Sequence, residues 1–363
     1  MRFLQLFPFY GEYIADFHRR FPDTAAQPYA EQKRRLVQDG YSIVHMFSRY
    51  LAPQGFETDI VFTEFESAQR QWLREQGLSL VDPAAWRHEI AAAQVNAFKP
   101  DVLYVTEPVG FDARFLARLT HRPRLVMGWK AASIPPQTDW RGFDLILSNF
   151  AQTFERGPAL GVKQVEFFTP GFPMSLRDEL PNEGKLIDVS FIGSVSSEHL
   201  TRTRYLTDLS KSQLTGENDF SLGYYLRTAE PDLVPVGIAI HNRGGLWGSD
   251  MARLLKGSRI ALNIGVDHAK GETGNMRMIE TGGMGTFLLT EYQDNIRRYF
   301  EPGVEAETFA SQGELEEKIR HYLANPDERE AIAARGRARC RRDFSMELAV
   351  VRLSELIGKH ART

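Results

Sequence analysis

Short apolar runs alternate along this chain with segments of helical periodicity, and this alternation limits the possible fold more than any other feature. In the first half, runs with the composition of buried strands fall at 2–8, 57–63, 101–107, 124–130, 143–149 and 164–169. Helical segments are predicted between them at 30–52, 84–98, 111–120 and 151–160. Strands that are apolar on both faces are typical of parallel sheets covered by helices. The pattern therefore predicts an α/β fold.

A segment rich in proline and glycine divides the chain. Residues 170–184 lack a clear periodicity, and we place a linker between two domains there. Beyond it, strands are predicted at 188–194, 234–240, 259–266, 286–291 and 305–309, and helices at 198–211, 314–324, 327–340 and 345–360. A chain of 363 residues can bury two separate cores. We expect two doubly wound domains, at 1–172 and 173–344, followed by a last segment at 345–363.

Composition and charge argue against several classes of protein. The net charge is −3, so there is no overall electrostatic case for binding nucleic acid. Cys340 is the only cysteine, which favours a reducing compartment. The apolar N-terminus is interrupted by Gln5 and Pro8, unlike a signal peptide, and no apolar run approaches the roughly 20 residues that span a membrane. We expect a cytoplasmic protein.

Known cofactor and metal motifs are missing from the sequence. It holds no phosphate-binding Walker loop, no dinucleotide Gly-Xaa-Gly-Xaa-Xaa-Gly fingerprint and no cysteine/histidine cluster with metal-ligand spacing. We therefore expect no resident cofactor and no metal site.

The segment 271–290 carries the most specific pattern for a binding site. It places Glu272 and Glu280 eight positions apart, with a helix predicted to begin near Asn275. The start of a helix presents unpaired N–H groups and the positive end of the helix dipole, which suit a diphosphate. Glu280 lies further along this helix, where a carboxylate can accept hydrogen bonds from sugar hydroxyls. Two solvated helix carboxylates would have the same spacing.

The order of the motifs around this segment resembles that of a known family. The strand Ile260-Ala-Leu-Asn263 is followed by Asn275-Met-Arg-Met-Ile-Glu280, then by a glycine-rich turn and the strand Phe287-Leu-Leu-Thr290. This series resembles the C-terminal domain of the group 1 glycosyltransferases, and in particular the branch similar to the spore maturation protein CgeB. Residues 257–345 carry nearly all of the resemblance.

The resemblance implies a fold and an activity. It implies the GT-B arrangement, in which two Rossmann-like domains face a cleft, and the segment 345–363 crosses back to the first domain. It also implies transfer of a sugar from a nucleotide-sugar donor, held by the second domain, to an acceptor held by the first. The donor is a substrate, so no cofactor is implied. The acceptor stays open between a glycan, a protein, a lipid-linked molecule and a small molecule.

The same resemblance assigns roles within the segment 271–290. Arg277 would approach the donor's diphosphate, and Glu280 would bind the ribose hydroxyls. Glu272 matches the first glutamate of the Glu-Xaa7-Glu pattern of retaining enzymes, which contacts the transferred sugar. Gly274 and Asn275 would let the backbone approach the donor.

Two further loops of the second domain are candidates for donor binding. Gly193 and Ser194 end a predicted strand, where backbone N–H groups can cradle a phosphate, and Arg202 and Arg204 follow on the next helix. A solvated position on the surface of that helix is an equal alternative for these arginines.

Arg243 and Trp247 lie in an unusual loop, in which Arg243 can reach a phosphate and Trp247 can stack on a base or a sugar. A structural role for the tryptophan is an equal alternative.

The first domain offers candidates after its strands. Gly11 follows the first strand and would allow close approach of the backbone to the donor phosphate. His18 lies where inverting relatives carry a histidine base, a role that a retaining enzyme does not need. Glu107, Trp129 and Lys130 lie at the ends of two other predicted strands, and structural roles are as plausible for them.

Two other functions stay open alongside a glycosyltransferase. A nucleotide-sugar epimerase of the same architecture would need no acceptor, and a silent nucleotide-sugar-binding scaffold would need no chemistry. Peripheral contact with an anionic membrane is a further possibility, because arginines cluster near the C-terminus. A solvated helix is the simpler interpretation of this cluster. The cluster comprises Arg335, Arg337, Arg339, Arg341 and Arg342.

Overall fold

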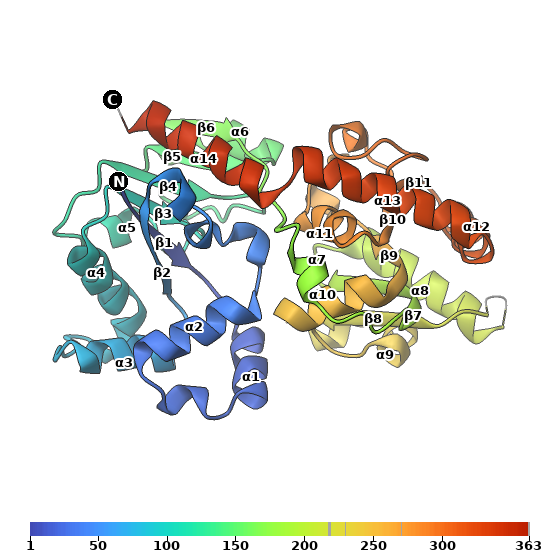
Figure 1. Ribbon diagram of the computed structural model, residues 1–363, viewed down its shortest axis with the longest axis horizontal. Coiled ribbons are helices and arrows are strands. Elements are labelled where there is room, and N and C mark those ends of the chain that lie inside the picture. The colour runs from blue at the N-terminus through green and yellow to red at the C-terminus, as the bar shows by residue number, and fades with distance from the viewer. Residues whose placement is uncertain (217–218, 229, 270, 362–363) are drawn as a thin grey trace. The chain divides into compact units, whose positions relative to one another are not determined.

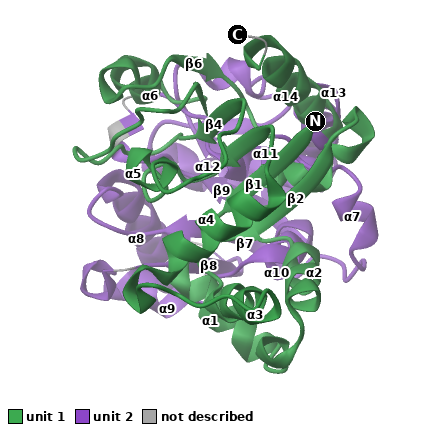
Figure 2. Ribbon diagram, turned by 90° about the vertical axis from the view of Figure 1, so that its left-hand side faces the viewer, with its two compact units in different colours: residues 1–170, 347–363 green, residues 171–346 purple. Residues whose placement is uncertain are grey.

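The computed structural model describes residues 1–361, apart from 217–218, 229 and 270. The chain forms two compact units, one of residues 1–170 with 347–363 and one of residues 171–346 (Figures 1 and 2). Each unit is built around one parallel sheet. The predicted α/β class and the two Rossmann-like domains are confirmed.

Unit 1 has six parallel strands in the order β2-β1-β3-β4-β5-β6. They are β1 (Arg2–Phe7), β2 (Glu57–Phe62), β3 (Val102–Val105), β4 (Leu125–Trp129), β5 (Leu145–Ser148) and β6 (Gln164–Phe167). All six predicted strands of this half are present. The chain runs outward from β1 to β2 and then back to β3, so the strand order reverses between β1 and β3. Such a reversal is where ligands bind in sheets of this kind.

The helices of unit 1 differ more from the prediction. They are α1 (Gly11–Arg20), α2 (Tyr29–Asp39), α3 (Glu66–Glu75), α4 (Trp86–Phe98), α5 (Ala113–Leu116), α6 (Ala151–Arg156) and α14 (Met346–His360). The predicted helix 30–52 is wrong beyond Asp39, because Gly40 takes a left-handed conformation (φ 71°) and short 3-10 turns follow. The prediction missed α1 and α3.

Unit 2 has five parallel strands in the order β11-β10-β9-β7-β8. They are β7 (Ile187–Ser194), β8 (Leu222–Arg227), β9 (Ser258–Asn263), β10 (Phe287–Glu291) and β11 (Glu307–Phe309). Counted from the first strand of each unit, this is the order of the first five strands of unit 1. The reversal here lies between β7 and β9.

The predicted strand 234–240 is wrong. It forms the helix α9 (Val236–His241), which begins directly after Pro235. A strand would place Val236, Ile238 and Ile240 on one face, but Ile238 is fully buried whereas Val236 and Ile240 are 78% and 59% exposed. The strand of this region is β8, which the prediction missed.

The remaining helices of unit 2 surround its sheet. They are α7 (Leu176–Glu179), α8 (Leu200–Leu214), α10 (Gly248–Gly257), α11 (Met276–Met284), α12 (Gln312–Ala324) and α13 (Pro326–Asp343). The core joins residues of β7, β8, β9 and β10 to α8 and α12. In the described part of the chain, no helix combines the length and the apolar character needed to cross a membrane.

Candidate functional site

The N-terminus of α11 lies just beyond the carboxyl end of β9. Residues 264–275 lead from β9 into this helix, which begins at Met276. Asn275 occupies the cap position in an extended conformation (φ −68°, ψ 149°), and its side chain makes no capping hydrogen bond to the described residues. The N–H groups of the first turn are therefore not capped by this side chain, and the positive end of the helix dipole is available to an anion.

Arg277 and Glu280 form an ion pair within the first turns of α11. Nη1 of Arg277 lies 2.7 Å from Oε2 of Glu280, and it also lies 2.7 Å from the sulfur of Met251 on α10. Glu280 is only 6% exposed. Nε of Arg277 is buried and has no hydrogen-bond partner among the described residues. The pair thus places one cation and one carboxylate beside an uncapped helix terminus.

The loop that carries Glu272 is fixed by hydrogen bonds to the side chain of Asn295 and the backbone of Asp294. The N–H of Thr273 donates to Oδ1 of Asn295, and the amide of Asn295 donates back to the carbonyl of Thr273, both at 2.8 Å. The N–H of Asp294 donates to the carbonyl of Gly271 at 3.2 Å. Glu272 itself is half-buried. The predicted contact of its carboxylate with a donor sugar stays a prediction.

Gly274 directly precedes the cap residue Asn275. Its φ of 153° is a conformation that side chains rarely adopt. A glycine is therefore required there by the turn into α11, whether or not a ligand approaches.

Arg202 joins the two strands at the reversal point of unit 2. Its guanidinium donates to the carbonyl of Ser194 at 2.7 Å, at the end of β7. It also donates to the carbonyls of Ile264 (2.7 and 3.1 Å) and Gly265 (3.1 Å), just after β9. Burial lowers the pKa of Arg202 to about 10. Arg202 therefore links the ends of β7 and β9 at the reversal of strand order. Its contact with a phosphate stays a prediction.

The N-terminus of α8 contrasts with that of α11. The carboxylate of Asp267 accepts from the N–H groups of Leu200 (2.6 Å) and Thr201 (3.2 Å), and Glu230 accepts from the N–H of Ser197 (2.9 Å). Acceptors of the protein itself therefore occupy the turn after β7. Of the two helix starts at this edge of the sheet, the better anion site is that of α11.

The other residues predicted near this turn lie around it. Gly193 leaves no room for a side chain, since a Cβ would lie 2.9 Å from the ring of Phe191. Arg204 is exposed and stacks on Tyr205 at 5.5 Å. Among the described residues, neither Gly193 nor Arg204 forms a hydrogen bond or ion pair with Arg277 or Glu280.

Arg243 lies beside β8, and Trp247 lies at the start of α10. The N–H of Arg243 donates to the carbonyl of Tyr224 at 2.8 Å, and the residue is exposed. Trp247 precedes α10 as its cap residue and packs close to Gly245, where a Cβ would lie 3.0 Å from the indole ring. Their predicted contacts with a phosphate and a base are not tested by this arrangement.

In unit 1, Gly11 and His18 lie at opposite ends of α1. Gly11 is the exposed first residue of the helix. His18 lies in the last turn, where its ring stacks on Phe65 at 4.9 Å between centroids, and partial burial lowers its pKa. Seven residues of helix separate the two by roughly 10 Å along the axis.

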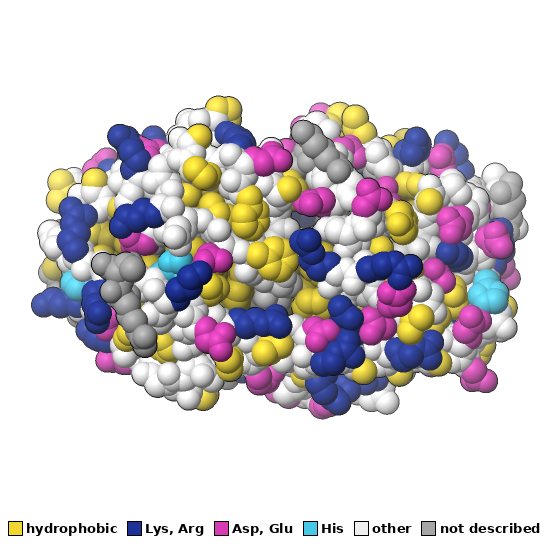
Figure 3. Space-filling model, turned by 90° about the horizontal axis from the view of Figure 1, so that it is seen from above, with side chains coloured by type: hydrophobic (Ala, Val, Ile, Leu, Met, Phe, Trp, Pro, Cys, Tyr) yellow, Lys and Arg dark blue, Asp and Glu magenta, His cyan; other side chains and the backbone are white. Residues whose placement is uncertain are grey.

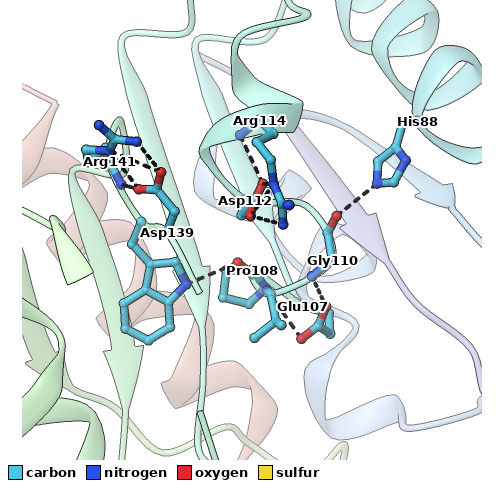
Figure 4. Close-up of polar contacts among 10 residues, drawn as sticks. His88, Glu107, Pro108, Gly110, Asp112, Arg114, Asp139 and Arg141 are labelled. Carbon is cyan, nitrogen blue, oxygen red and sulfur yellow. Dashed lines mark hydrogen bonds and ion pairs between the residues drawn. The ribbon is translucent and has the colours of Figure 1, made fainter. Parts of the chain in front are cut away.

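Glu107 lies just beyond β3, in a turn held by hydrogen bonds to its carboxylate (Figure 4). Its carboxylate accepts from the N–H groups of Gly110 (2.6 Å) and Val109 (3.3 Å), and Lys130 lies 3.7 Å away. Nε2 of His88 lies 2.9 Å from the carbonyl oxygen of Gly110 and so supports the same turn from α4 (Figure 4). These contacts hold Glu107 at the carboxyl edge of the sheet.

Glu64 is a candidate that the sequence prediction missed. It follows β2 and accepts from the N–H of Phe9 at 3.1 Å and from Arg87 at 3.3 Å. Burial raises its pKa, and the nearby charge of Glu107 adds to this effect. The rule that selects residues after parallel strands would have found it, had it been applied to the predicted strand 57–63.

Comparison with known proteins supports the fold. The family model described as "Glycosyl transferase-like" matches residues 203–354, which include Arg277 and Glu280. No curated protein matches this sequence. Within the described residues, no group of three or more His, Cys, Asp or Glu side chains is arranged to hold a metal ion.

Several solved structures resemble the whole chain at 12% identity. A glycosyltransferase from Rickettsia africae gives a TM-score of 0.60, with 100% of this chain and 99% of that chain covered. HepE from Anabaena, in complex with UDP-glucose, gives 0.61 with 99% and 100% covered. A sucrose-phosphate synthase from Thermosynechococcus elongatus gives 0.59 with 99% and 98% covered. Neither the family model nor these structures distinguish the branch similar to CgeB. The chain has the fold of the GT-B glycosyltransferases, with two Rossmann-like domains.

Proposed function

We propose that this protein is a glycosyltransferase that moves a sugar from a nucleotide-sugar donor to an acceptor hydroxyl. One observation carries the proposal. The N-terminus of α11, which the Asn275 side chain does not cap, carries the Arg277–Glu280 pair within its first two turns, at the carboxyl edge of the unit 2 sheet. The binding of UDP-glucose by HepE, which shares the fold, supports a nucleotide sugar as the donor.

The donor's diphosphate would bind at the start of α11. The first-turn N–H groups and Arg277 supply positive charge there, so we propose that the transfer needs no metal ion. Glu280 would accept hydrogen bonds from the ribose hydroxyls, because its carboxylate lies one turn further along the same helix. Residues 173–344 would form the donor domain, and residues 1–172 the acceptor domain.

We propose that the transfer retains the donor's anomeric configuration. Glu272, on the fixed loop before α11, would contact the sugar and orient it. The bond between the anomeric carbon and the leaving phosphate oxygen breaks, and the bond to the acceptor oxygen forms on the same face. The acceptor's proton passes to an oxygen of the leaving diphosphate. No protein base is then needed.

The acceptor side would be the carboxyl edge of the unit 1 sheet. Glu64 and Glu107 follow β2 and β3 there, each beside a cation, Arg87 and Lys130 respectively. Such paired carboxylates can accept hydrogen bonds from several hydroxyl groups. This suits an acceptor rich in hydroxyls more than an apolar one, and leaves its exact class open.

A ligand screen followed by a turnover assay tests the proposal. A donor should raise the melting temperature in a screen of UDP, GDP, dTDP and CMP sugars, because it binds only the folded state. Mass spectrometry should then show a glycosylated product only when an acceptor is present. A changed sugar without any acceptor would indicate an epimerase, and binding without turnover would indicate a scaffold. No stabilisation by any nucleotide sugar would refute the proposal.

A further inference from the structure

Three arginines surround a small cavity in unit 2, away from the start of α11. Arg177 of α7 and two residues of α13, Arg337 and Arg341, line a cavity of about 220 Å³. Arg337 and Arg341 are four positions apart, so they share one face of α13. The cavity is several times the roughly 30 Å³ that one water occupies in the liquid. It is large enough for a small hydrated anion.

The carboxylates near this cavity are already paired. Glu330, which also lines it, lies 3.2 Å from Arg329, and Asp178 lies 3.5 Å from Arg337. Among the described residues, the guanidinium groups of Arg177 and Arg341 have no hydrogen-bond or ion-pair partner. The cavity therefore holds an excess of positive charge.

Arg337 is the most constrained of the three. Its side chain is 16% exposed, and its Nε is buried without a partner among the described residues. Burial lowers its pKa, and repulsion from Arg177 and Arg341 lowers it further. The positive charges of Arg177 and Arg341 thus lie near the partly buried guanidinium of Arg337. An anion bound between the three would relieve their repulsion.

The cavity lies at the opposite end of α11 from the donor site. Gly285 caps the C-terminus of that helix in a left-handed conformation (φ 70°) and also lines the cavity. A Cβ on Gly285 would lie 3.1 Å from Cδ of Arg337 and 3.4 Å from Cζ of Arg177. The nine residues of α11 separate the two ends by roughly 13 Å. The helix C-terminus offsets only about half a unit of charge, less than one arginine.

We propose that the cavity of Arg177, Arg337 and Arg341 binds a phosphate group, carried either by a soluble phosphate ester or by the headgroup of an anionic lipid. Bidentate pairing with phosphate oxygens is the usual use of converging guanidinium groups. On the face seen in Figure 3, Lys and Arg side chains are interleaved with carboxylates over the part of unit 2 that carries α13. A charged surface of this kind also suits contact with a polar headgroup.

Calorimetric titration with inorganic phosphate tests the site. The titrations use an Arg277→Gln background, so that binding at the other end of α11 contributes least. Arg177→Gln and Arg341→Gln should each weaken phosphate binding by about tenfold, as expected for the loss of one charge-assisted contact. Arg342→Gln is the matched control. It removes the same charge one position away, from a side chain 59% exposed and already paired with Asp343.

A vesicle arm distinguishes the two sources of phosphate. Sedimentation with phosphatidylcholine vesicles, with and without phosphatidic acid, should show binding that depends on Arg177 and Arg341 if the ligand is a headgroup. Phosphate binding without vesicle binding would assign a soluble ester. The proposal is overturned if neither probe binds, or if Arg342→Gln weakens binding as much as Arg341→Gln.

Discussion

Nη1 of Arg277 lies 2.7 Å from the carboxylate of Glu280, and both side chains project from the first two turns of α11. The pair is partly withdrawn from water, so each charge depends on the other when no donor is present. A diphosphate that binds Arg277 and the helix N–H groups would supply a second anion. Glu280 could then turn its lone pairs to the donor's hydroxyls. Binding of the diphosphate and binding of the donor's hydroxyls would thus be linked through the Arg277–Glu280 ion pair.

Glu280→Ala should weaken nucleotide binding by about 1–3 kcal/mol, because it would remove the proposed charged hydrogen bonds to the ribose. Calorimetry with the nucleotide found in the ligand screen measures this change. Glu317→Ala removes an exposed glutamate of α12 and is the control for a general loss of charge. Unchanged affinity in a folded Glu280→Ala variant would remove this residue from the site.

Gly283→Ala should destabilise unit 2, because α11 packs closely at this glycine. A Cβ there would lie 2.3 Å from Cδ1 of Phe172, so the ring or the helix must move. Overpacking of this kind costs about 1–3 kcal/mol. Urea unfolding measures the loss. Gly313→Ala in α12 is the control, since a Cβ there meets no atom within 4 Å, and its stability should not fall.

The strands of this protein were easier to predict than its helices. Strands such as Leu145–Ser148 are fully buried on both faces, so their apolar runs stand out in the sequence. The strand Leu222–Arg227 was missed because Gly223 and two tyrosines dilute the apolar signal. The helix α9 resembled a strand because Val236 and Ile240 are apolar, although both are exposed. Whether an apolar side chain on a short helix is buried or exposed cannot be predicted from its residue type alone.

The candidate site was predictable only in part. The order of the motifs placed Arg277 and Glu280 on one helix, and the structure adds their ion pair. The sequence contained no sign that Asp267 caps α8. The carboxylate of Asp267 accepts from the N–H of Leu200, which lies 67 positions earlier in the chain. For the same reason, the burial of Arg202 against carbonyls after β9 was not foreseen. Long-range contacts of polar groups leave no local pattern.

The stability of unit 1 should depend on pH through His45. Partial burial of its ring, including a buried Nδ1, lowers the pKa of His45 from its ordinary value of 6.5 to about 4. Between these two values the unfolded chain binds a proton that the folded chain does not, so stability falls as the pH drops from 6.5 towards 4. The full loss is on the order of 3 kcal/mol, at 1.36 kcal/mol per pKa unit.

Urea unfolding of the parent protein and of His45→Gln across this range isolates the effect. The substituted side chain does not titrate, so the stability of the variant should change less with pH. Equal slopes in the two proteins would show that His45 does not cause the acid sensitivity.

Transfer should continue in excess EDTA, because the proposed positive charge comes from Arg277 and the start of α11 rather than from a metal ion. Initial rates with and without EDTA should agree within error. Arg277→Gln should instead lower the rate by at least about tenfold, the usual scale for losing one charged contact to a transition state. Loss of activity in EDTA that manganese or magnesium restores would contradict this mechanism.

The product should keep the anomeric configuration of the donor. In the proposed reaction the diphosphate leaves and the acceptor attacks on one face of the sugar, while Arg277 stabilises the charge that develops on the phosphate oxygen. That oxygen also takes the acceptor's proton, so His18→Ala should retain most of its activity. The packing of His18 on Phe65, in the last turn of α1, agrees with this expectation.

Proton NMR of the new glycosidic linkage, recorded beside the donor, decides the stereochemical outcome. An inverting reaction needs a side-chain base on the face opposite the leaving group. In that case the candidates in unit 1 are His18, Glu64 and Glu107. Glu64 is distinguished by its raised pKa, which burial and the charge of Glu107 produce. Inversion together with an inactive His18→Ala, Glu64→Gln or Glu107→Gln variant would identify that base and replace the retaining mechanism. Retention with all three variants active would instead support the leaving diphosphate as the proton acceptor.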